Sequence, residues 1–140
     1  MAETFEIEID TPERRLAQEQ AIRAQIPAQD GYIGVLPNHA PLLSILGVGV
    51  LTYTTPDNRH HVMAVRGGFL EILDNRVRVL PDRADKGSEI DVAQAEKELR
   101  DAEAAMVDPS LGIDIAGALI GVQHAQARID AANKHKSGEE

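Results

Sequence analysis

Gly31-Tyr32-Ile33-Gly34-Val35-Leu36-Pro37-Asn38-His39-Ala40-Pro41-Leu42-Leu43 is the most informative stretch of this chain. Two glycines and two prolines interrupt an otherwise apolar run, so we expect its flanks to be buried. The two prolines fix the shape of the loop around the histidine, which lowers the entropic cost of contacting a partner. A rigid turn between strands is the alternative interpretation. We predict a preshaped contact for another protein, made by Asp30, Gly31, Pro37, Asn38, His39 and Pro41.

The first half of the chain alternates apolar and polar residues with a period of two. Phe5, Ile7 and Ile9 alternate with acidic residues, and Val77 and Val79 alternate with arginines. This period is typical of strands with one buried and one wet face. Further strand-like runs at 48–54, 59–66, 69–73 and 76–80 are bounded by turn residues, and Asp74-Asn75 predicts a tight hairpin. Glycine pairs such as Gly67-Gly68 are expected to mark strand ends or bulges. The pattern favours an antiparallel sandwich or barrel of about eight to ten strands.

The second half changes to the helical period. Apolar residues recur every three or four positions in two series: Val92, Ala95, Leu99, Ala102, Met106, and then Leu111, Ile115, Ala118, Val122, Ala125, Ile129, Ala132. These predict two amphipathic helices joined by a short loop, that is, an antiparallel helical hairpin over residues 88–140. Asp91 with Gln94 three residues later is a candidate capping box. Alanine stripes bury little area, so we expect the hairpin to be marginal and to depend on a partner surface.

Composition and charge exclude several classes of function. The net charge is −9, with nine basic and twelve acidic residues over 1–87 and five and eleven over 88–140, which disfavours nucleic acid and anionic lipid as partners. There is no cysteine and no apolar run long enough to cross a bilayer, so no thiol chemistry and no direct membrane insertion are expected. The histidines lack ligand spacing, and no nucleophile-elbow, zincin or P-loop motif occurs. We therefore predict no catalytic residues, no metal and no cofactor in this chain.

Four segments in order resemble the epsilon subunit of bacterial F-type ATP synthase. They are the 31–43 stretch, the 65–72 stretch with Gly67-Gly68 and Glu71, the 77–84 strand, and Ser88-Glu89-Ile90-Asp91 before an alanine-rich hairpin. The resemblance implies an α+β chain with a β-sandwich domain (1–87) and a helical hairpin (88–140). It also implies a central-stalk subunit on the cytoplasmic face of the bacterial inner membrane, peripheral to it. Its partners would be the gamma subunit, the membrane rotor c-ring and, through the extended hairpin, the alpha/beta head. Such a subunit couples ion-driven rotation to ATP synthesis and regulates ATP hydrolysis.

Some members of that family bind a regulatory ATP through a motif that opens the first helix. The matching residues here are Ile90, Asp91, Ala95 and, on the second helix, Arg128. Gln94 and His124 stand where those relatives have arginines, and the loss of two guanidiniums removes strong phosphate ligands. We therefore expect weak ATP binding. The alternatives to a stalk subunit are a free-standing β-sandwich module that dimerises through its helix pair and, third, a small enzyme with an unrecognised site.

Overall fold

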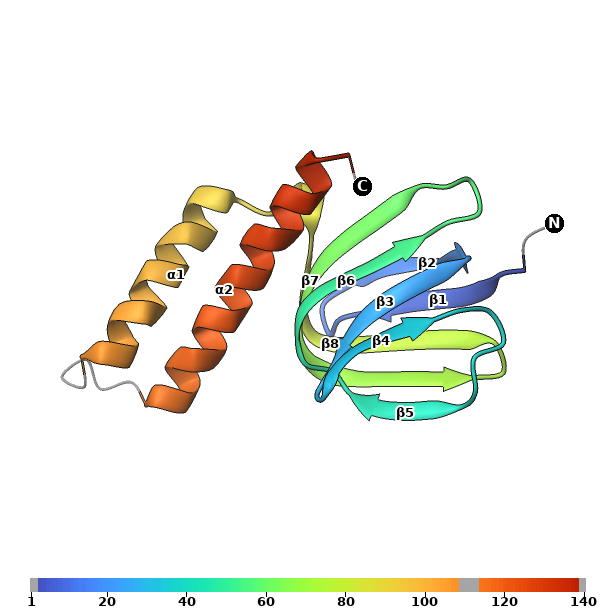
Figure 1. The fold of residues 1–140 in the computed structure, drawn as a ribbon, viewed down its shortest axis with the longest axis horizontal. Coiled ribbons are helices and arrows are strands. Elements are labelled where there is room, and N and C mark those ends of the chain that lie inside the picture. The colour runs from blue at the N-terminus through green and yellow to red at the C-terminus, as the bar shows by residue number, and fades with distance from the viewer. Residues whose placement is uncertain (1–2, 109–113, 139–140) are drawn as a thin grey trace.

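The computed structural model describes residues 3–108 and 114–138. The strands come first and the helices last (Figure 1). The elements are β1 (Phe5–Asp10), β2 (Arg15–Ala21), β3 (Arg23–Ala28), β4 (Gly31–Val35), β5 (Leu42–Ile45), β6 (Val48–Thr54), β7 (His60–Leu73), β8 (Arg76–Lys86), a short 3-10 turn η1 (Gly87–Glu89), α1 (Val92–Val107) and α2 (Ile115–Lys136). The prediction of a strand-built first half followed by two helices is confirmed.

The eight strands pair in the order β2-β1-β8-β7-β6-β3-β4, and β5 pairs with β7 outside this path. All of these pairs are antiparallel except β1–β8, which is parallel. The predicted antiparallel sandwich is confirmed, with this one pair as a parallel exception. Its register sets Glu6 opposite Arg76 and Glu8 opposite Arg78, so oppositely charged side chains face each other across the β1–β8 pair.

β7 is one continuous strand, where the sequence predicted a break after residue 66. It pairs with β6 over its first half and with β5 over its second half. Gly67 and Gly68 have φ angles of 67° and 100°, which a residue with a side chain rarely adopts. Val65 before them and Leu70 after them both point into the core, so the strand exchanges faces at the glycines while its register with β8 continues. The glycines therefore mark a bend through which β7 joins both layers of the sandwich.

The core lies between the two layers and is almost entirely aliphatic. Its large, fully buried side chains come from β1, β3, β4, β6, β7 and β8, and include Phe5, Ile7, Ile9, Ile26, Val35, Leu51, Val65, Leu70, Ile72, Val77 and Val79. The period-two series that the sequence predicted as buried faces, on β1 and β8, is thus confirmed.

The helices stand side by side at one end of the sandwich, and α2 lies between α1 and the strands (Figure 1). Each begins at an aspartate: Asp91 accepts a hydrogen bond from the Gln94 backbone N–H at 3.1 Å, and Asp114 caps α2 in the same way. A second apolar cluster joins α2 to the sheet through Val62, Ala64, Ala127 and Ala131, with Val48, Val50 and Ile90 beside them. Within the described residues neither helix is long and apolar enough to cross a membrane.

The predicted stripe of the second helix holds only in part. Ala118, Ala125 and Ala132 are buried, whereas Ile115 is 67% exposed and Leu111 lies outside the described residues. The sequence missed the other buried face of α2, formed by His124, Ala127 and Ala131. Because α2 packs on α1 and on the sheet, it needs two buried faces, and small alanines let both approach closely.

Candidate partner-binding surfaces

The β4–β5 loop lies at the end of the sandwich far from the helices (Figure 1). Its shape is fixed by hydrogen bonds as well as by prolines. Asn38 has a φ of 65°, and its backbone N–H donates to the Asn75 side-chain oxygen at 2.7 Å. The Asn75 amide in turn donates to the Thr4 carbonyl at 2.8 Å. The β7–β8 hairpin therefore holds the loop against the start of β1. The sequence identified Asn75 as a turn residue, and only the structure shows this second role.

His39 is half-buried in this loop, and its Nδ1 lies 2.7 Å from the Ala40 carbonyl oxygen. Because a carbonyl only accepts, Nδ1 carries the hydrogen and donates, which leaves Nε2 as the acceptor. Asp30 and Gly31 are exposed, but they lie in the β3–β4 turn, at the other end of β4 from the loop. The six predicted contact residues therefore form two groups, at opposite ends of one strand.

An apolar strip lies on the outer face of β5 and the second half of β7. It consists of Leu43, Ile45, Phe69 and Leu73, which are 74%, 49%, 58% and 48% exposed. Ile45 pairs with Phe69 in the β5–β7 register, so the strip is continuous across the two strands. β5 follows Pro41 directly, and a shallow hollow lined by Pro41, Leu43 and Leu73 connects the strip with the loop. An exposed apolar patch of this kind on a small domain marks a contact surface.

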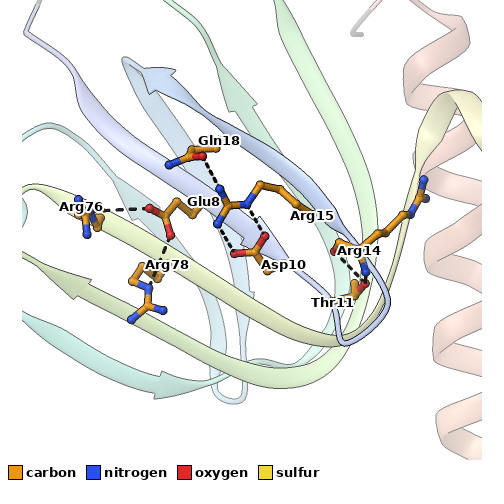
Figure 2. A network of polar contacts seen from close by, with 8 residues as sticks. All are labelled: Glu8, Asp10, Thr11, Arg14, Arg15, Gln18, Arg76 and Arg78. Carbon is orange, nitrogen blue, oxygen red and sulfur yellow. Dashed lines mark hydrogen bonds and ion pairs between the residues drawn. The ribbon is translucent and has the colours of Figure 1, made fainter.

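A set of ion pairs borders the strip on β1 and β8 (Figure 2). Glu8 lies between Arg76 and Arg78, at 3.9 Å and 3.7 Å, and it is only 8% exposed. Arg78 also pairs with Glu71 at 3.6 Å, and Glu71 lies between Phe69 and Leu73 along β7. The outer face therefore combines an apolar half with a polar half whose charges are already paired.

The residues matched to the ATP motif lie at the junction of the helices and the sheet. Asp91 caps α1, Ala95 is fully buried, and Ile90 packs on the second cluster. Arg128 is largely buried and pairs with Asp85 of β8 at 3.3 Å and Glu98 of α1 at 2.8 Å. Its guanidinium is thus held by two carboxylates, and a phosphate would have to displace them.

Among the described residues no three histidine or acidic side chains are placed to hold a metal ion. His60 and His61 are neighbours on β7 whose rings have different surroundings. The His61 ring stacks on Tyr53 at a centroid distance of 4.6 Å, and His60 lies near the Thr54 hydroxyl. The Tyr53 hydroxyl donates to Glu19, and burial followed by this bond raises the pKa of Tyr53.

Comparisons with known proteins agree with this architecture. Residues 4–87 match the family model described as the ATP synthase delta/epsilon chain β-sandwich domain. The first half is thus the sandwich of a delta- or epsilon-type ATP synthase chain. Over the whole length, the chain is 47% identical to the ATP synthase epsilon chain of Solibacter usitatus across 96% of this chain and 99% of the relative. It is 42% identical to that of Syntrophomonas wolfei across 96% and 98%. The chain belongs to the ATP synthase epsilon-chain family, and the resemblance inferred from its motifs is confirmed.

Solved structures share the fold. A chain of the Euglena gracilis mitochondrial ATP synthase superposes with a TM-score of 0.81 at 22% identity, covering 93% of this chain and 81% of that one. A chain from the central stalk and c-ring of the Tetrahymena thermophila mitochondrial enzyme superposes with a TM-score of 0.55 at 14% identity, covering 93% and 94%. The agreement extends over both the sandwich and the helices, since nearly the whole chain is covered. Family membership does not favour a free-standing module that dimerises through its helices.

Proposed function

We propose that this chain is a non-catalytic rotor subunit of the central stalk of an F-type ATP synthase. It couples ion-driven rotation to ATP synthesis and regulates ATP hydrolysis through its C-terminal helices. It works on the cytoplasmic face of the bacterial inner membrane, as a peripheral subunit. The observation that carries the proposal is the apolar strip, which gives a member of this family an outward-facing surface suited to a permanent partner.

The apolar strip is the proposed contact with the gamma subunit. Stable interfaces have an apolar centre with a polar rim, and large aromatic residues dominate their binding energy. Phe69 is the aromatic residue of the strip and lies beside Ile45, and the paired charges of Glu8, Arg76 and Arg78 border the strip. Since those charges are already neutralised within the chain, a partner can cover the border without leaving a buried charge unpaired.

The loop from Pro37 to Pro41 is the proposed contact with the rotor c-ring. Its backbone is preorganised by the Asn38–Asn75 hydrogen bond, so binding orders little further chain. Asn38, His39 and the exposed Pro41 present polar and apolar groups together. Asp30 and Gly31, in the turn at the other end of β4, form a second partner contact that is separate from the loop.

The free end of the hairpin is the proposed contact with the alpha/beta head. Ile115, Leu119 and Ile120 on α2 and Val107 on α1 are exposed there, with Val107 the most exposed at 81%. In the docked state, in which the hairpin packs on the sandwich as in this structure, these side chains have no large apolar surface to cover them. An extended hairpin could bury them against a partner, which gives the helices two alternative packings.

Binding of purified gamma to the full-length chain tests the proposal. Phe69→Ser and Leu43→Ser should each weaken binding at least about tenfold, the level expected for central interface residues. Leu36→Ser is the matched control, because Leu36 is 64% exposed but lies outside the strip, and it should bind normally. His39→Ala should keep the fold and weaken assembly with the ring. Unchanged gamma affinity in both strip variants would count against the surface. Self-association of the free chain in place of a one-to-one complex would support the module alternative.

A further inference from the structure

His124 lies on α2 where the helix packs on the sandwich. The residue is only 5% exposed, and its Nδ1 is buried without a hydrogen-bond partner among the described residues. On the same helix, Ala127 and Ala131 pack on Val62 and Ala64 of β7. The imidazole is therefore part of the surface that holds the hairpin on the sheet.

The charged groups around His124 are mostly cationic. Arg66 of β7 and Arg83 of β8 lie opposite each other in the sheet register, and neither has an ion-pair partner within 4 Å in the described residues. Arg128 is on α2 itself, and the two nearby carboxylates, Asp85 of β8 and Glu98 of α1, are both engaged by it. β6 presents the apolar Val48 and Val50 to this contact. A positive charge at position 124 would therefore lie beside three guanidiniums, and both nearby carboxylates already pair with Arg128.

We propose that His124 is an acid-sensitive latch on the hairpin. The neutral ring allows α2 to dock on the sandwich, and protonation of the ring releases it. The released helices then become available for the extended state. The latch concerns the isolated chain, and only its consequence for ATP hydrolysis rests on the function proposed above.

The direction and size of the pH effect on docking follow from the thermodynamic linkage between protonation of His124 and docking of the hairpin. Burial, and then the charges of Arg66, Arg83 and Arg128, lower the pKa of His124 from 6.5 to about 4 in the docked state. A lowered pKa means that docking favours the neutral ring, so its stabilising effect is complete above pH 6.5 and is lost as the pH falls from 6.5 toward 4. Between about pH 7.5 and pH 5.5 the ratio of docked to released hairpin should fall about tenfold.

Amide hydrogen exchange on the full-length chain measures this ratio even when the released state is rare. Exchange rates of α2 amides, each divided by the rate of an unstructured peptide at the same pH, give the opening constant of the helix. In the wild-type chain this constant should rise about tenfold from pH 7.5 to pH 5.5. Core amides of β1 and β8 should show a much smaller change. His124→Gln should abolish the rise on α2, and His135→Gln, a histidine on the same helix, should keep it.

The readout is the pH dependence, so a variant that is less stable overall remains informative. Arg83→Gln should reduce the rise, because it removes one of the charges that oppose protonation of His124. A wild-type opening constant that does not change between the two pH values would overturn the proposal. An unchanged rise in His124→Gln would overturn it as well. Neither result bears on gamma binding, so failure of the latch and failure of the stalk assignment are distinguishable.

Discussion

Replacing Gly68 by alanine should strongly destabilise the sandwich. A Cβ at this position would lie 2.1 Å from the Leu80 carbonyl oxygen and 2.7 Å from the Pro81 Cα, both of them backbone atoms of β8. Pro81 is fully buried and cannot move aside without disturbing the core. The φ of 100° adds strain for any residue with a side chain. Backbone strain of about 1–3 kcal/mol and overpacking of about 1–3 kcal/mol together predict a loss of roughly 2–6 kcal/mol.

Urea unfolding followed by circular dichroism measures this loss. Gly34→Ala is the matched control, because no heavy atom lies within 4 Å of a Cβ there and its φ is ordinary. We expect the control to stay within about 0.5 kcal/mol of the wild type. The Gly68→Ala chain should in addition melt more than about 10 °C lower. A loss below about 1 kcal/mol for Gly68→Ala would refute the claim that the bend depends on this glycine.

Three further predictions concern the β-sandwich, the helical hairpin and the binding of ATP. Residues 1–87 expressed alone should give a dispersed amide NMR spectrum, because this half has its own core; a collapsed spectrum would contradict separate folding. Truncation after Lys86 should preserve ion-driven ATP synthesis and raise ATP hydrolysis in a reconstituted complex, whereas equal hydrolysis rates would show that the hairpin is not inhibitory. ATP should bind the isolated chain in about the millimolar range or not detectably. Arg128 is already paired with two carboxylates, and one charge-assisted pair supplies about 1.5–3 kcal/mol of the roughly 8 kcal/mol that micromolar affinity needs. Calorimetry decides this: Gln94→Arg should tighten binding, and a low-micromolar wild-type dissociation constant would show that other phosphate ligands exist.

Local patterns predicted the elements well. The alternation of Phe5, Ile7 and Ile9 gave a buried face of β1, and Asp91 was identified as the cap of α1 before the structure showed it. Both signals depend only on neighbours in sequence, which is why they could be found without coordinates. The parallel β1–β8 pair could not be found in this way, since its partners are some seventy residues apart and no connecting motif links them.

The surfaces were harder to predict than the elements. Along residues 69–73, Leu70 and Ile72 face the core while Phe69 and Leu73 face outward, yet both pairs are apolar. Periodicity finds such a strand but cannot say which face is buried, because the exchange of faces at Gly67 and Gly68 decides it. His124 was missed as a buried residue for a similar reason: its identity suggests an exposed position, and only the packing of α2 on two surfaces covers it.

The long ladder between β7 and β8 has a mechanical consequence. Its register runs from Met63 opposite Lys86 to Leu73 opposite Arg76, so β7 is hydrogen-bonded to β8 along its length while it carries part of the apolar strip at one end and the surface that packs on α2 at the other. A tangential load applied to the strip would therefore act along the strands and stretch many hydrogen bonds together, which resists rupture better than opening them one at a time. Gly67 and Gly68 lie within this ladder, so such a load would pass through the bend that they form. Optical-tweezer pulling between the strip and α2 should accordingly require more force than peeling β2 from its sheet edge.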